Sequence, residues 1–208
     1  DYAITHRDAK MPEKWDGKIM VPFPVESALS GVMKRVGQDN ALWYRTRIPR
    51  PKGAAWDGKR LLLHFGAVDW QTTVWINGHK VGEHTGGYDP FSFDVTEAIG
   101  STKDISDEII IRVWDPTDAS FQPRGKQVNN PHGIWYTPVT GIWQTVWLEP
   151  VEQTYIQSLR IIPDIDTGEI TIAPNLNKEL EGYTFEITVK PEKDNPDPWV
   201  IWKGPSSA

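Results

Sequence analysis

The stretch VWINGHKVGEHTGGYDPFSFDV (residues 74–95) decides the fold of this chain. Asn77-Gly78 within it is a strong hairpin signal, because both central positions of a type I′ turn need a positive φ. A two-residue turn at this point fixes the register of two antiparallel strands. The predicted pairs are Ile76 with His79, Trp75 with Lys80, and Val74 with Val81. The residues expected on the core face are Val74, Ile76 and Val81, followed by Phe91 and Phe93 as the next core pair.

Two histidines in this stretch, His79 and His84, raise the question of a metal site. Their offset of five is odd, and an odd offset along a strand sends side chains to opposite faces. A zinc site needs three or four convergent ligands, and His64 could approach them only across the sheet. We therefore expect no metal and no other cofactor. His132, in a long loop, is the only histidine of further interest.

Other runs rich in β-branched and aromatic residues, bounded by Gly, Pro, Asp or Asn, predict further strands. These runs cover residues 42–48, 60–68, 72–81, 88–95, 107–115 and 142–151. Helical signal is limited to one capped turn in DVTEAIG (residues 94–100), with Asp94 or Thr96 as the N-cap. Because strands do not alternate with helices, residues 1–150 are predicted to form an all-β, antiparallel sandwich of jelly-roll type.

The pattern changes after Pro150. Strands are predicted at residues 154–164, 168–176 and 182–192, with a fourth in PWVIWKG (residues 198–204). Their spacing is typical of an immunoglobulin-like sandwich, but such a domain takes about 100 residues. Residues 151–208 are therefore expected to form a truncated immunoglobulin-like domain.

Composition excludes several classes of partner. The chain has 208 residues with 22 basic and 28 acidic side chains, a net charge of −6, and no long run of either sign. A basic patch for nucleic acid or for an anionic membrane is therefore not expected. No apolar stretch approaches the roughly 20 residues that span a bilayer. There is no cysteine, which excludes disulfides and thiolate metal sites.

Several separate blocks resemble the N-terminal sugar-binding domain of glycoside hydrolase family two, the family of bacterial β-galactosidases, β-glucuronidases and β-mannosidases. The blocks are KIMVPFPVESALSGV (18–32), LWYRTRIPRP (42–51), LHFGAVDWQTTVWINGHKVGEHTGGYDPFSFDVT (63–96), RGKQ (124–127) and GIWYTPVTGIWQTVWLEPV (133–151). The resemblance covers residues 1–150 in order. The tail from Val151 is similar to the first half of the family's immunoglobulin-like domain.

The resemblance implies a parent enzyme built of a jelly roll, an immunoglobulin-like sandwich and a TIM barrel, which hydrolyses β-glycosides with retention through two glutamates on the barrel. Neither glutamate has a counterpart here, so no catalytic residue is expected and the chain should be inactive alone. Its implied partners are the barrel and, within the whole enzyme, a carbohydrate. For that enzyme a periplasmic or secreted location is favoured over a cytoplasmic one. Galactoside, glucuronide and mannoside are equally compatible with the sequence.

Candidate sugar-binding residues lie in the long connection after Asp115, PTDASFQPRGKQVNNPHGIWYTPVTG (residues 116–141). A loop of this length inside a compact domain is usually functional. Asp115 and Asp118 flank a turn, where Asp is a common turn former. The resemblance implies instead that Asp115 accepts hydrogen bonds from a sugar hydroxyl, with Asp118 as the fallback.

The same loop carries two cations and an amide in Arg124, Lys126 and Gln127. A charged loop segment is usually only solvated. The resemblance favours a segment that leans on the barrel rim, where the cations could pair with carboxylates of the barrel or with an acidic sugar.

Eleven tryptophans leave two alternatives open. Most are expected to be structural, because indole is a large core side chain that strands accept readily. A free-standing carbohydrate-binding module could instead use exposed tryptophans such as Trp56, Trp70 or Trp75. A structural β-sandwich of a cell-surface protein would need no sugar site.

Overall fold

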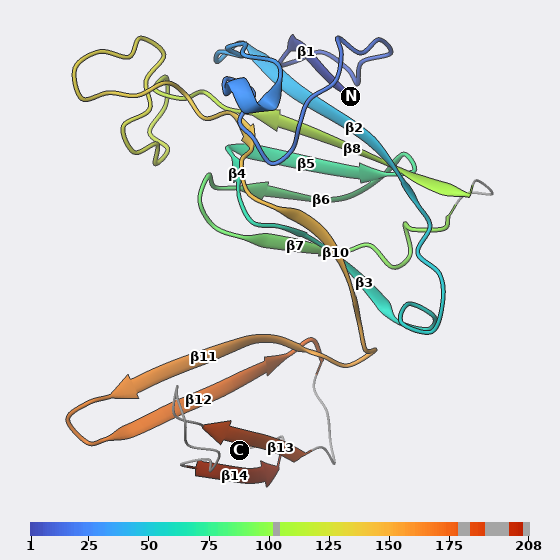
Figure 1. Ribbon diagram of the computed structural model, residues 1–208, viewed down its shortest axis with the longest axis vertical. Coiled ribbons are helices and arrows are strands. Elements are labelled where there is room, and N and C mark those ends of the chain that lie inside the picture. The colour runs from blue at the N-terminus through green and yellow to red at the C-terminus, as the bar shows by residue number, and fades with distance from the viewer. Residues whose placement is uncertain (102–104, 179–183, 190–199, 206–208) are drawn as a thin grey trace. The chain divides into compact units, whose positions relative to one another are not determined.

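The computed structural model describes residues 1–101, 105–178, 184–189 and 200–205. The chain divides into two compact units, Asp1–Glu152 and Gln153–Ala208 (Figure 1). Among the described residues, no helix is long and apolar enough to cross a bilayer. The sheets confirm the predicted all-β, antiparallel class, since every pairing between named strands is antiparallel.

The first unit contains a five-stranded sheet in the order β1-β2-β8-β5-β6. Its strands are β1 (Tyr2–His6), β2 (Asn40–Pro49), β5 (Gln71–Ile76), β6 (His79–Thr85) and β8 (Ser106–Trp114). β8 lies at the centre, between β2 and β5. Its alternation is as predicted, because Ile109, Ile111 and Val113 belong to the main core while Ile110 packs with Trp43 on the other face.

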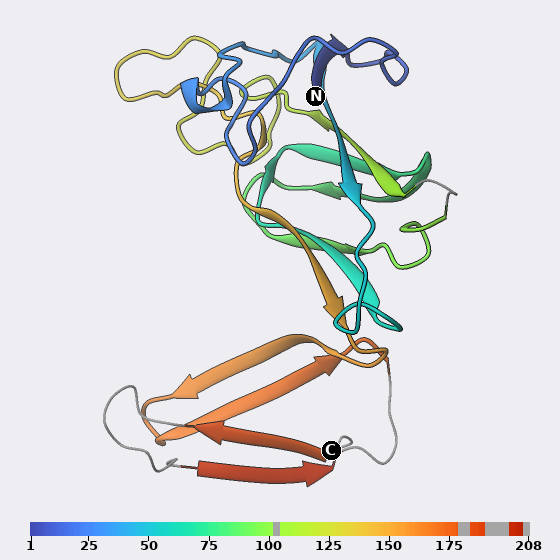
Figure 2. The same ribbon diagram turned by 45° about the vertical axis from the view of Figure 1, so that its right-hand side comes forward.

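A second layer is the three-stranded sheet β10-β3-β7, which faces the larger sheet (Figure 2). It consists of β3 (Arg60–Phe65), β7 (Phe91–Asp94) and β10 (Val146–Val151), and a short pair joins β4 (Val68–Asp69) to β9 (Gly141–Ile142). The single strand predicted over residues 142–151 is therefore interrupted, and its first part pairs elsewhere. The strand β1 and the 3-10 helix η1 (Ala28–Ser30) were not predicted.

Large apolar side chains between the layers form the core. The largest that are fully buried are Phe65, Leu42, Ile76, Ile142, Val25, Val68, Val74, Val95 and Val113. Residues 96–100 form turns without a helix, and Asp94 Oδ1 accepts the Thr96 N–H at 3.1 Å. The capped turn is thus present, but it does not grow into a helix.

The hairpin of β5 and β6 corrects one predicted pair. Ile76 lies opposite His79 and Trp75 opposite Lys80, as expected, but Val74 lies opposite Gly82 because of a β-bulge. Val81 still packs against the core cluster, as do Phe91 and Phe93. The Phe93 ring lies over Gly82, and a Cβ at that position would lie 2.2 Å from its Cε1 atom. This close approach favours glycine opposite Val74.

The bulge also corrects the prediction that His79 and His84 lie on opposite faces. His84 pairs with Thr72 and His79 with Ile76, and Thr72 and Ile76 share one face of β5. His84 stacks on Phe91 at 4.0 Å between ring centroids, whereas His79 is exposed. Within the described residues there is no group of three or more His, Cys, Asp or Glu side chains that could hold a metal.

In the second unit, the described residues form two antiparallel pairs of strands. β11 (Ile156–Asp164) pairs with β12 (Glu169–Leu176), and β13 (Thr184–Val189) pairs with β14 (Val200–Pro205). These four strands match the four predicted runs, although parts of the last two runs lie outside the described residues. The immunoglobulin-like assignment and the boundary after Pro150 stay predictions.

Candidate functional site

The long loop of residues 116–140 leaves the sandwich where β8 ends (Figure 1). Asp115 is the first residue after β8 and only 2% of it is exposed. Its Oδ1 atom accepts the Thr117 N–H at 2.6 Å, and its Oδ2 atom accepts the Thr140 hydroxyl at 2.9 Å. Asp115 thus joins the two ends of the loop.

Glu26 approaches the same place from the segment before η1. One carboxylate oxygen accepts the Thr140 N–H at 3.0 Å. The other oxygen, Oε1, is buried and has no hydrogen-bond partner in the described structure. The pKa of Glu26 is raised to about 7, chiefly by burial and to a smaller extent by the nearby Asp115 carboxylate, while the Thr140 hydrogen bonds oppose the increase.

Asp69, at the end of β4, is the third buried carboxylate. Asp69 pairs with Gly141 of β9. Its side chain lies close to Gly87, so that a Cβ on Gly87 would lie 2.6 Å from Asp69 Oδ1. Gln127 Nε2 donates to Asp69 Oδ2 at 3.1 Å. Burial raises the pKa of Asp69 to about 7, with Asp115 and then Glu26 adding to the effect.

We call Glu26, Asp69 and Asp115 the acidic cluster. Burial also raises the pKa of Asp115, and Asp118 adds a smaller increase. The hydrogen-bond partners in this cluster are hydroxyls, backbone N–H groups and an amide, none of them a cation. Glu26 and Asp69, with pKa values of about 7, are partly protonated near neutral pH and can then act as either donors or acceptors of hydrogen bonds.

Of the predicted sugar-binding residues, the structure brings Asp115 and Gln127 to the acidic cluster. Gln127 spans it, because its Oε1 atom also accepts the Val139 N–H at 2.6 Å. The turn-forming role considered for Asp115 is present. Its carboxylate is occupied by protein donors on both oxygens, so direct contact with a sugar would need one of them to be displaced.

The other three predicted residues lie on the loop outside the cluster. Asp118 is exposed and accepts the Asn129 N–H at 3.2 Å. Lys126 is exposed, with its Nζ atom 5.9 Å from the centroid of the Tyr136 ring. Arg124 is half-buried, and its Nε atom is buried without a hydrogen-bond partner in the described structure. These three side chains are not held together by contacts with one another.

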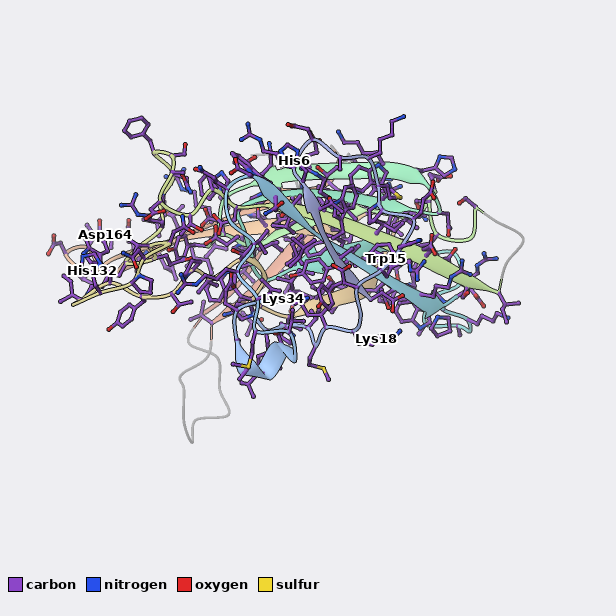
Figure 3. All side chains as sticks on the ribbon, turned by 90° about the horizontal axis from the view of Figure 1, so that it is seen from above. His6, Trp15, Lys18, Lys34, His132 and Asp164 are labelled. Carbon is purple, nitrogen blue, oxygen red and sulfur yellow. The ribbon has the colours of Figure 1, made fainter. Side chains whose placement is uncertain are left out.

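The loop and its neighbour after β6 also present apolar side chains to solvent. Their exposed members are Tyr88, Phe121, Ile134 and Tyr136. His132 lies at the outer rim of the loop (Figure 3), and its Nδ1 atom is 2.8 Å from the Asn130 carbonyl oxygen. Large exposed apolar side chains concentrated on one loop are typical of a surface that contacts another body.

The tryptophans named for a binding module are less accessible than that role requires. Trp56, Trp70 and Trp75 are half-buried. Trp56 packs against the main core, and Trp75 stacks on Trp43 with ring centroids 5.8 Å apart. Their burial supports a structural use.

Sequence reasoning missed Glu26 and Asp69. Both stand inside otherwise apolar runs, PFPVES and FGAVDW. A carboxylate within a run that predicts a buried segment is the signal that would have identified them, because a buried charge needs a specific reason to be there.

Comparison with known proteins gives a consistent result. Curated relatives include a β-galactosidase of Thermoanaerobacter pseudethanolicus, 32% identical over 124 residues that are 59% of this chain and 15% of the relative. A β-glucuronidase of Paenibacillus borealis is 32% identical over 197 residues, 85% of this chain and 30% of the relative. Solved structures include the Faecalibacterium prausnitzii β-glucuronidase, with a TM-score of 0.69 and 20% identity over 98% of this chain and 38% of that one. At this identity the structural likeness shows the fold alone.

The chain spans less than a third of the length of these two curated relatives. Residues 8–148 match the sequence profile described as "Glycosyl hydrolases family 2, sugar binding domain". This match covers more than half of the chain, in the unit that contains the acidic cluster and the long loop. The chain therefore belongs to glycosyl hydrolase family 2, as the sugar-binding domain of that family followed by a second β-unit.

Proposed function

We propose that this chain is the non-catalytic N-terminal region of a retaining β-glycoside hydrolase, which supports a TIM barrel and lends the loop of residues 116–140 to the sugar site of that barrel. The observation that carries the proposal is how the loop is held. Its base is fixed to the acidic cluster through Asp115, Thr140 and Gln127. Its outer part presents Lys126, Tyr136 and Ile134 to solvent.

The five predicted residues then divide into two roles. Asp115 and Gln127 are mainly positioning residues. Asp115 binds groups at both ends of the loop, and Gln127 links Asp69 to the Val139 N–H near the end of the loop. Asp118, Arg124 and Lys126 are the side chains proposed to reach a sugar or the barrel rim. A buried guanidinium nitrogen without a partner, as in Arg124, favours a carboxylate or hydroxyl supplied from outside this unit, because such a donor is costly to leave unpaired.

The substrate proposed is a β-glycoside. The relatives named above are a β-galactosidase and a β-glucuronidase, so the two substrates to compare are a galactoside and a glucuronide. Cations on the loop would favour the acidic sugar, since Arg and Lys form charge-assisted hydrogen bonds with a carboxylate.

The test uses the enzyme encoded by the whole reading frame. We expect R124A and K126A to raise KM for p-nitrophenyl β-D-glucuronide or β-D-galactoside by roughly 10-fold, the range of one hydrogen bond to a charged group. K52A, an exposed cation outside the loop, is the matched control and should leave KM unchanged. A reading frame without a barrel, or unchanged KM in both loop variants, would contradict the proposal.

The 208-residue chain gives a second test. Without the two barrel glutamates it should hydrolyse neither substrate. Turnover that copurifies with the chain through several chromatographic steps would overturn the assignment of a non-catalytic role.

A further inference from the structure

The outer face of the three-stranded sheet carries a tryptophan that the family assignment does not explain. Trp147 on β10 lies opposite His64 on β3, and His64 lies opposite Ser92 on β7. Their neighbours Val146, Phe65 and Phe91 form the row that faces the core. Since side chains alternate along a strand, Trp147, His64 and Ser92 form a row on the opposite, outer face. Trp147 is 45% exposed.

The imidazole ring of His64 packs against one face of this indole. The two rings are stacked, with centroids 4.7 Å apart and planes 11° from parallel. His64 is itself fixed, because its Nε2 atom is 2.8 Å from Glu149 Oε2. β10 is an edge strand of its sheet, so no described strand of this sheet covers the side of Trp147 that faces away from His64. One indole face is thus supported and the other is accessible.

Polar groups surround the ring on the same outer face. The next row consists of Glu149, Leu62 and Asp94, in which Leu62 is buried. Arg60 follows on β3, and its Nη2 atom lies 2.5 Å from Asp94 Oδ2. An apolar floor with hydroxyl and carboxylate groups around it offers a stacking surface and hydrogen-bond acceptors within one small area.

These features fit a neutral pyranose. The C–H groups on one side of a sugar ring can pack on an indole, while its hydroxyls donate to Glu149 and to Ser92. Asp94 is not counted as an acceptor, because Thr96 and Arg60 already engage its two oxygens. Two carboxylates stand against one guanidinium, which already pairs with Asp94, so an anionic sugar would be repelled. One exposed tryptophan is also too small for a stable protein interface, which buries about 800 Å² per partner.

We propose that Trp147, His64, Glu149 and Ser92 form a surface site for neutral sugars, which we call the Trp147 platform. It lies on the outer face of the sheet and uses no residue of the long loop. It would hold a neutral portion of a carbohydrate chain and would not take part in hydrolysis. The platform is independent of the proposed function, which concerns the loop.

Titration of the 208-residue chain with lactose and cellobiose tests the platform. Binding is followed by the indole N–H signals in 1H–15N NMR spectra. We expect one indole signal, absent from the W147A spectrum, to shift saturably with Kd about 1 mM. Glucuronic acid at the same concentration should leave that signal in place. The W147A variant should lose at least roughly tenfold in affinity, since it removes the stacking face.

W114A is the matched control. Trp114 is half-buried on the other sheet, and its Nε1 atom donates to the Gln38 carbonyl at 2.7 Å. This variant should keep the affinity for lactose. If W147A does not fold, E149Q replaces it, because it keeps the indole and should weaken binding severalfold through the loss of a charged acceptor.

Three results would overturn the platform. One is the absence of saturable binding up to about 50 mM sugar, far above the expected Kd. Another is equal loss of affinity in W147A and W114A. The third is a change in self-association of W147A, seen by sedimentation, with unchanged sugar affinity, which would identify the face as an interface between copies of the chain. All three leave the proposed function intact, since its tests measure loop variants in the whole enzyme.

Discussion

The central strand β8 has a buried aspartate at each end, and the surroundings of the two carboxylates differ. Asp107, at its beginning, is fully buried. It accepts hydrogen bonds from Asn77 Nδ2 at 2.7 Å and from the Gly100 N–H at 2.8 Å, and the Arg50 guanidinium approaches it through Nη2 at 3.4 Å. Asp115, just after the other end, has only neutral donors and two further carboxylates nearby.

The pKa directions follow from these surroundings. Burial alone would raise the pKa of Asp107, but the Asn77 amide, the Gly100 N–H and Arg50 outweigh it and hold the pKa below its ordinary value. At Asp115 the burial effect prevails and the pKa is raised. Asp107 is therefore held in its ionised form by its hydrogen-bond partners, and we call it a structural lock. Asp115 has a raised pKa because the effect of burial outweighs its neutral hydrogen-bond donors. Perturbed carboxyl groups of the second kind are typical of functional sites.

The largest predicted effect on stability concerns Asp107. Asp107→Ala should lower the free energy of unfolding by about 3–5 kcal/mol, because it leaves a buried amide, a backbone N–H and a guanidinium without their shared acceptor. Urea denaturation at pH 7 measures the loss. Asp57→Ala, at an exposed turn, should change stability by less than about 0.5 kcal/mol. Similar values for the two variants would show that Asp107 is not a lock.

The second prediction concerns pH at the acidic cluster. Glu26 has a folded pKa of about 7 against an ordinary value of 4.5, so the folded state holds its proton more tightly than the unfolded state. Its contribution to stability is complete below pH 4.5 and is lost as the pH rises through 7. We expect wild type to lose about 2–3 kcal/mol of unfolding free energy over this range from Glu26 alone.

Glu26→Gln isolates that contribution, since glutamine cannot ionise. The difference in stability between wild type and E26Q should change with pH between 4.5 and 7, in the direction that favours E26Q at the higher pH. Asp107 works in the opposite sense and at lower pH, because its lowered pKa gives stability that disappears as the pH falls through the folded pKa. A constant difference between the two proteins across this range would mean that Glu26 is already ionised when buried.

A smaller effect is expected where Thr140 links Glu26 and Asp115. Thr140→Val keeps the shape and the backbone N–H but removes the hydroxyl that Asp115 Oδ2 accepts at 2.9 Å. The loss should be about 1–1.5 kcal/mol at pH 5, measured by urea denaturation. Thr140→Ser is the matched replacement, because it keeps the hydroxyl donor and should retain most of the wild-type stability. If serine and valine behave alike, packing of the methyl group and not the hydrogen bond would account for the effect.

The features of this unit also differ in how far the sequence predicts them. Local signals sufficed for most of the strands and for the Asn77-Gly78 turn, because turn type and strand periodicity depend on neighbouring residues. They missed β1 and the interruption between β9 and β10. The bulge opposite Val74 has no local signal, and the glycine there lies under the ring of Phe93, a contact between separate strands. Asp115 and Gln127 were named as candidates because of the long loop and the family resemblance, and their sugar-binding role stays a prediction. Glu26 and Asp69 were missed, since their burial arises only when distant segments pack together.

The smallest predicted effect on stability concerns Asp115, and it contrasts directly with that of Asp107→Ala. Asp115→Asn keeps an acceptor oxygen for the Thr117 N–H, and its amide nitrogen replaces the oxygen that accepts the Thr140 hydroxyl, so that this hydroxyl must accept a hydrogen bond instead of donating one. The change also removes a carboxylate that repels Glu26 and Asp69. These two effects oppose one another, so stability at pH 7 should change by less than about 1 kcal/mol. The variant should also lower the pKa of Glu26, measured by NMR titration of its side-chain carboxyl carbon. A large loss of stability, comparable to that of Asp107→Ala, would show that the Asp115 carboxylate is essential to the fold, and that both ends of β8 are structural locks.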